Sequence, residues 1–105
     1  MKKIEAVILP LHVDAVRREL RRHGIGSGLT VVAVRHSDDH KQLLPMEQAA
    51  SQTLQDRVKL ELFVDDSEVD KAVNVILRHA QADYDDEGGQ IAVLEVDKTL
   101  RIGPN

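Results

Sequence analysis

Residues 36–56, from His36 to Asp56, lack a regular hydrophobic period and separate two halves of the chain that show the same order of elements. Connections in compact domains usually span about 4–6 residues, and irregular loops beyond about 12–15 residues are uncommon unless they are functional or disordered. A chain of 105 residues with so long a connection between two strands is expected to use it for contact with another molecule. We therefore expect the two flanking halves to form the folded domain and residues 36–56 to contact another molecule.

The first half reads as strand, helix and strand, expected at residues 2–9, 13–23 and 29–35. In the helix, Val13, Val16 and Leu20 recur on one face, and Gly24 provides a stop after the last turn. The strand at 29–35 is β-branched and apolar almost throughout, which is typical of a central strand covered on both faces.

The second half repeats this order, with strands expected at 57–64 and 91–96, a helix at 69–81, and a short terminal strand around Leu100 and Ile102. The strand at 57–64 alternates most clearly between apolar and charged residues. Asp65 and Glu68 have the spacing of a helix-capping pair. The helix face is expected to contain Val69, Ala72, Val73, Ile76, Leu77 and Ala80.

Two βαβ halves of this length predict an α+β, ferredoxin-like βαββαβ fold as a single domain over residues 1–105. Such a domain has a four-stranded antiparallel sheet with both helices on one face. The other face needs a cover, and the apolar residues of several strands favour other copies of the same chain.

Composition excludes several classes of function. A net charge of −4, a pI near 5.7 and only 2% aromatic residues argue against nucleic-acid binding. The opening residues do not form a signal peptide, and no stretch approaches the ~18 apolar residues of a membrane span. We therefore expect a soluble, cytoplasmic protein without direct membrane insertion. No Ser/His/Asp or paired-carboxylate set stands out, so the chain is expected not to be an enzyme.

Two clusters within residues 36–56 are candidate sites. His36, Asp38, Asp39 and His40 are residue types that bind zinc, nickel or copper, although a solvated loop stem would have the same composition. Leu43, Leu44 and Met46 form an apolar cluster that suits partner binding, with packing of the loop onto its own oligomer as the alternative. The acidic residues 83–89 do not have calcium-loop spacing and are interpreted as a solvated turn.

Several stretches resemble the PII signal-transduction superfamily over nearly the whole chain. These stretches are MKKIEAVILP, VDAVRREL, GIGSGLTVVAV, RVKLELFVDDSEVDKAVNVILRHAQ and GGQIAVLEVDKTLRI. The resemblance implies a homotrimer of ferredoxin-like subunits with a long T-loop, here 36–56, that grips transporters and enzymes. It also places a B-loop at 83–89 and a C-terminal strand at 99–103.

The resemblance implies a nucleotide or effector cleft formed by Thr30, Arg57, Gly89, Gln90 and Arg101. Typical members have a lysine where this chain has Gln90 and a second arginine where it has Gly103. The B-loop here contains four carboxylates, Asp83, Asp85, Asp86 and Glu87, which would repel a triphosphate. We therefore expect weak or absent ATP binding and a better fit for AMP or ADP. The T-loop also lacks a tyrosine that could be modified, since Tyr84 lies in the B-loop.

Three functional hypotheses follow. The first is a non-enzymatic regulator that senses a small effector between subunits and controls a membrane transporter or a metabolic enzyme through residues 36–56. The second is a divalent-metal-binding protein of metal homeostasis or efflux, with a role like that of the structurally similar CutA family. The third is a bicarbonate-responsive PII-like protein of carbon uptake, which none of these residues selects.

Overall fold

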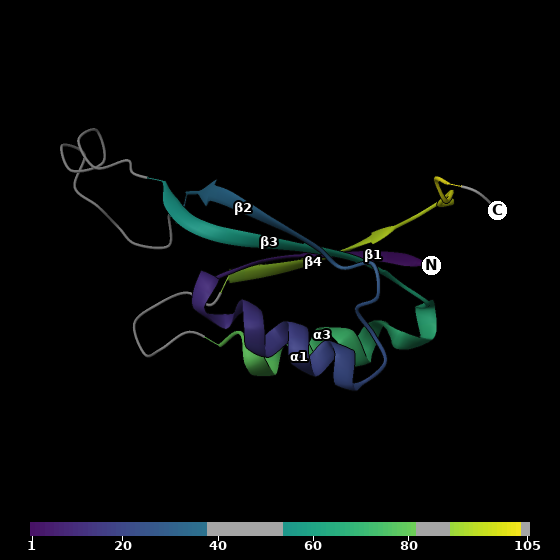
Figure 1. The fold of residues 1–105 in the computed structure, drawn as a ribbon, viewed down its shortest axis with the longest axis horizontal. Coiled ribbons are helices and arrows are strands. Elements are labelled where there is room, and N and C mark those ends of the chain that lie inside the picture. The colour runs from purple at the N-terminus through teal and green to yellow at the C-terminus, as the bar shows by residue number, and fades with distance from the viewer. Residues whose placement is uncertain (38–53, 82–88, 104–105) are drawn as a thin grey trace.

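The computed structural model describes residues 1–37, 54–81 and 89–103. Four strands form one antiparallel sheet, and the two α-helices lie together on one of its faces (Figure 1). The elements are β1 (Lys2–Ile8), η1 (Pro10–His12), α1 (Val13–Arg22), β2 (Thr30–His36), β3 (Gln55–Val64), η2 (Asp66–Glu68), α3 (Val69–His79) and β4 (Gly89–Glu95). This arrangement confirms the predicted βαββαβ fold.

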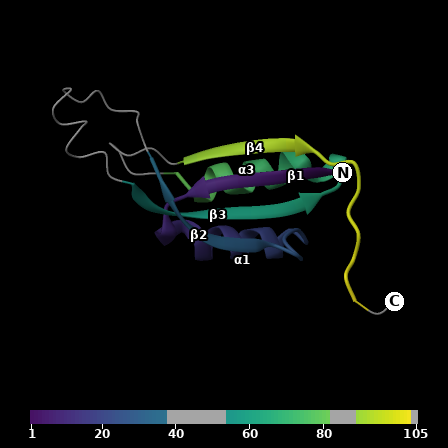
Figure 2. The ribbon, with the colours of Figure 1, turned by 90° about the horizontal axis from the view of Figure 1, so that it is seen from above.

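The strand order is β2-β3-β1-β4, so β1 and β3 are the inner strands and β2 and β4 the edges (Figure 2). Ile4 of β1 lies opposite Leu62 of β3 on one side and Val93 of β4 on the other. Residues directly opposite each other in an antiparallel pair share a face of the sheet. The register therefore assigns every described strand residue to the helix-covered face or to the open face.

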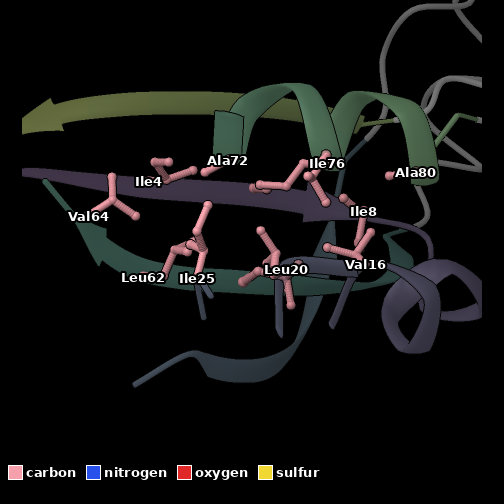
Figure 3. Close-up of a cluster of buried hydrophobic side chains, with 13 residues drawn as sticks. Ile4, Ile8, Val16, Leu20, Ile25, Leu62, Val64, Ala72, Ile76 and Ala80 are labelled. Carbon is pink, nitrogen blue, oxygen red and sulfur yellow. The ribbon is translucent and has the colours of Figure 1, made fainter. Parts of the chain in front are cut away.

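The core lies between the sheet and the helices and is aliphatic (Figure 3). Alternation along the two inner strands sends one set of side chains into it, and the apolar stripes of both helices complete it. The side chains with the largest volumes that are fully buried are Ile4, Ile8, Val16, Leu20, Leu60, Leu62 and Ile76. The alternation predicted for β1 and β3, and the face predicted for α1, are confirmed.

A Schellman motif ends α1 and fixes the turn that follows. The amide of Gly24 donates to the Arg21 carbonyl at 3.0 Å, and the amide of Ile25 donates to the Leu20 carbonyl at 2.8 Å. Gly24 has a φ of +75°, which allows the chain to reverse without a Cβ clash. Ile25 then packs into the core with Leu20 and is only 5% exposed, although the glycines on both sides predict a flexible turn.

The expectation that residues 29–35 form a central strand covered on both faces is wrong. β2 is an edge strand, and its Val31 and Val32 are 45% and 39% exposed. An apolar run shows that a strand needs cover, but it does not show whether the cover belongs to the same chain. The apolar composition of β2 therefore remains available for another molecule.

Several boundaries also differ from the prediction. His36 pairs with Gln55, so the ladder takes three residues, 36, 55 and 56, from the segment expected to be a loop. Asp65 makes no side-chain cap, because a 3-10 turn intervenes and the Glu68 amide donates to the Asp65 carbonyl. Leu77 is 54% exposed, and Val75 is buried in its place. No strand forms at 96–103, where Leu100 and Ile102 lie exposed without strand partners.

Replacing Gly89 by Ala tests the close packing at the start of β4. Gly89 has a φ of +118°, and a Cβ there would lie 1.8 Å from the Val7 carbonyl oxygen. We expect a loss of at least about 2 kcal/mol in the free energy of unfolding, from the backbone strain and the clash together. Urea denaturation at a fixed protein concentration measures this loss.

Gly24→Ala is the matched control, because Gly24 also has a positive φ but nothing lies within 4 Å of its added Cβ. We expect Gly24→Ala to cost about 1 kcal/mol from the backbone conformation alone. Equal losses in the two variants would contradict the packing explanation.

Candidate functional site

The open face of the sheet carries a cluster of four charged side chains in the middle of β1 and β3. The register places Lys3 and Glu5 of β1 beside Glu61 and Lys59 of β3 on this face. The Lys3 ammonium lies 2.9 Å from the Glu5 carboxylate and 3.8 Å from the Glu61 carboxylate, and the Lys59 ammonium lies 3.1 Å from Glu61. All four side chains are only a quarter to a third exposed, at 24–33%.

Positive and negative charges alternate in this cluster, so each lysine lies beside a carboxylate of the same chain. Hydrogen bonding to the Lys3 ammonium lowers the pKa of the Glu5 carboxyl below its ordinary value of 4.5, and the same pair raises the pKa of Lys3. Lys3 also lies 6.0 Å from the centre of the Phe63 ring, a cation–π distance. The cluster was missed in the sequence because its members come from two strands. The signal was present as alternate charged residues in two segments that were both predicted to be strands.

The candidate effector residues do not converge within one chain. Thr30 begins β2 and lies opposite Glu61, whereas Gln90 lies in β4 opposite Val7. β3 and β1 separate these two edge strands, so three strand spacings, about 14 Å, lie between them. Arg57 also faces the open side, in β3, where it pairs with Val34 and its guanidinium donates to the Asp56 carbonyl at 2.8 Å. Thr30, Arg57 and Gln90 therefore lie on three different strands of the sheet.

Arg101 lies outside the sheet. It is exposed and belongs to residues 96–103, which leave β4 without forming the strand that the resemblance implied. Thr99 is held near the chain start, where its hydroxyl lies 3.8 Å from the Met1 sulfur. Gly89 and Gln90, in contrast, occupy fixed ladder positions opposite Ile8 and Val7.

The predicted metal ligands can be placed only in part. His36 ends β2 and lies opposite Gln55, while Asp38, Asp39 and His40 are outside the described residues. Among residues 1–37, 54–81 and 89–103, no group of three or more His, Cys, Asp or Glu side chains could hold a metal ion. The predicted metal site therefore stays a prediction. The partner-binding cluster Leu43, Leu44 and Met46 also stays a prediction, because these three residues lie outside the described ranges.

These features define the class of protein: a small α+β domain of ferredoxin-like topology with a charged open sheet face and candidate binding residues at both sheet edges. The family model described as nitrogen regulatory protein P-II matches residues 1–105. The chain belongs to this family, whose members are non-enzymatic signal transducers. The resemblance stated from the sequence motifs is confirmed.

The similarity to individual relatives extends over nearly the full length. The chain is 36% identical over 104 residues to the nitrogen regulatory protein P-II of Pasteurella multocida, covering 97% of this chain and 91% of the relative. It shares the same identity and coverage with the P-II protein 1 of Escherichia coli K12. The P-II protein of Pyropia yezoensis is 29% identical over 107 residues, which cover 100% of this chain and 94% of the relative.

In the described ranges, no helix has the length and apolar composition that a membrane crossing requires.

Replacing Glu5 by Gln tests the charge cluster. Because the folded-state pKa of Glu5 is lowered, its stabilising effect is present above the ordinary value of 4.5 and is lost as the pH falls through the lowered value. We therefore expect Glu5→Gln to lower the urea midpoint at about pH 7, and we expect the difference from wild type to shrink when the measurement is repeated at an acidic pH below 4.5.

Asp97→Asn is the control, because Asp97 is exposed and makes no ion pair among the described residues. Its urea midpoint should match that of wild type at both pH values. A difference between Glu5→Gln and wild type that does not depend on pH would show that the lost interaction is not electrostatic.

Proposed function

We propose that the protein is a cytoplasmic, homotrimeric P-II-type regulator that senses a small effector between subunits and controls a transporter or an enzyme through residues 36–56. The observation that carries this proposal is the separation of Thr30 and Gln90 on opposite edges of one sheet. A cleft that contains both residues requires two copies, with the β2 edge of one copy facing the β4 edge of another. The similarity to nitrogen regulatory P-II proteins supports the regulatory role.

The open sheet face supports an assembly of identical copies. Apolar side chains border its charged cluster, and Val32, Phe63 and Leu94 are 39%, 47% and 40% exposed there. Exposed apolar side chains that lie together mark a surface that another protein covers. A second copy offers the same alternating charges and can pair Lys3 or Lys59 with a carboxylate of its neighbour.

Phosphate recognition would depend on few cations. Arg57 and Arg101 are the arginines that match the expected cleft, and Gln90 offers an amide where a lysine would add a charge. A site with fewer cations favours AMP or ADP over ATP, because each further phosphate adds negative charge that lacks a partner. The effector would then stabilise one conformation of residues 36–56, and the partner would read Leu43, Leu44 and Met46 in that conformation.

Light scattering and calorimetry test this function together. Three copies of 11.7 kDa predict a particle of about 35 kDa. We expect ADP or AMP to bind the trimer with a Kd near the micromolar range, about −8 kcal/mol, and ATP to bind more weakly. A monomer, or a trimer without affinity for any adenine nucleotide, would contradict the proposal.

Separate titrations with zinc, copper and nickel would test the metal-binding hypothesis that includes His36 and His40.

Gln90→Lys tests the location of the cleft. Adding an ammonium beside the phosphates should strengthen ATP binding by about tenfold, close to 1.4 kcal/mol, and should change AMP binding much less. Lys98, which is exposed in the segment after β4, allows a control in the opposite direction: Lys98→Gln should leave both affinities unchanged. Equal effects of Gln90→Lys on ATP and AMP would place Gln90 away from the terminal phosphates.

A further inference from the structure

A groove of about 1030 Å³ lies between α1, the turn at residues 24–29 and the edge strand β2. One wall is charged and is formed by α1, with three arginines and one carboxylate: Arg17, Arg18, Arg21 and Asp14. The other wall is apolar and is formed by Val13, Ile25, Leu29 and Val31. The Schellman motif that buries Ile25 fixes the backbone where the two walls meet. The groove is therefore built on ordered backbone.

Positive charge is concentrated on α1. Four of the 14 lysine and arginine residues, Arg17, Arg18, Arg21 and Arg22, lie in this one helix, although the chain has a net charge of −4. At 100° per residue they fall within an arc of about 140°, away from Val16 and Leu20 in the core. The four side chains form one basic stripe.

Part of this charge has no internal partner. Arg22 lies 3.3 Å from the Glu19 carboxylate, and Arg17 lies 4.0 Å from Asp14, at the limit of an ion pair. Arg18 and Arg21 are exposed, and no carboxylate among the described residues lies within ion-pair distance of them. Two guanidinium groups on the charged wall are thus available to a ligand.

The groove is separate from the proposed effector residues. Val31 lies opposite Leu60 and therefore faces the helix side of the sheet, whereas Thr30 faces the open side with Glu61. Assembly through the open face leaves α1 on the outer surface, because both helices lie on the other face (Figure 1). A molecule in this groove would therefore contact the helix side of β2, whereas Thr30 lies on the open side.

We infer that this groove docks an acidic, extended segment of the protein that the regulator controls, in which carboxylates alternate with apolar residues. Arg17 and Arg21 are one helical turn apart, about 6 Å along the axis, which matches the ~6.6 Å between alternate residues of an extended chain. Carboxylates on one side of such a segment would face the arginines, and apolar side chains on the other would cover Leu29 and Val31.

The geometry favours this ligand over other anions. The arginines are spread along more than one turn and do not converge on one point, which suits a chain of carboxylates better than a single phosphate. The apolar wall offers nothing to the phosphates of a nucleic acid, whereas it can pack against the apolar residues of such a segment. The inference rests on the proposed function, since it describes the partner of that regulator.

Fluorescence anisotropy of the full-length protein with a labelled peptide of about ten alternating Glu and Leu residues tests the inference. We expect saturable binding that weakens as salt rises from about 0.05 to about 0.3 M. The peptide with Gln in place of Glu, and a single-stranded DNA of similar length, should bind at least about tenfold more weakly.

The variant Arg18→Glu/Arg21→Glu should weaken peptide binding by at least about tenfold, and neither residue has an ion pair to lose. The matched control is Lys71→Glu/Arg78→Glu, which makes the same change in net charge at exposed positions of α3. Equal weakening in both variants would overturn the inference, because it would show an effect of net charge alone. Arg18→Gln/Arg21→Gln provides a milder variant if the charge reversal disturbs folding, and it should also weaken binding.

The same samples separate this inference from the proposed function. Arg18→Glu/Arg21→Glu should keep the oligomeric mass and the ADP affinity of the wild type. Wild-type protein that binds ADP but not the Glu-Leu peptide would overturn the docking groove alone. DNA that binds as tightly as the peptide would also overturn it, in favour of a general polyanion surface. Wild-type protein that binds neither AMP nor ADP would instead contradict the proposed effector.

Discussion

The pairing of β1 on both of its edges is the constraint on which the rest of the structure depends. Its seven residues align with β3 on one side and β4 on the other, so segments 50 or more residues away in sequence take fixed positions beside it. The same strand sends Ile4, Ala6 and Ile8 into the core and Lys3 and Glu5 to the open face. Both the packing of the helices and the charged surface follow from the alternation of one strand.

The fold could be predicted because its signals are local. Alternation in β1 and β3 and the stripe Val13, Val16 and Leu20 in α1 determine which side chains meet. Features that depend on distant partners were predicted less well. The apolar run of β2 indicated a central position, yet sheet order is set by pairing between segments. The burial of Ile25, which stands between two glycines, could not be predicted from local sequence, because it depends on the hydrogen bonds that close the helix end.

The candidate sites show the same limit. The residues Thr30, Gln90 and Arg101 come from correspondence with a family, and no spacing along the chain indicates that two of them lie on opposite edges of a sheet. The charges of Lys3, Glu5, Lys59 and Glu61 were visible one strand at a time, but their distances became clear only from the register. The arginines of α1 are visible in the sequence on the helix face away from Val16 and Leu20, but the groove beside them requires β2 and the turn in place.

The separation of the two sheet edges has a consequence for mixed assemblies. If each cleft takes its β2 part from one copy and its β4 part from the next, a defect at Thr30 and a defect at Gln90 damage different halves of a cleft. Two inactive chains, one with each defect, could then restore intact clefts when they assemble together. A cell that holds two related chains of this family could likewise form hybrid clefts, with effector preferences that neither chain has by itself.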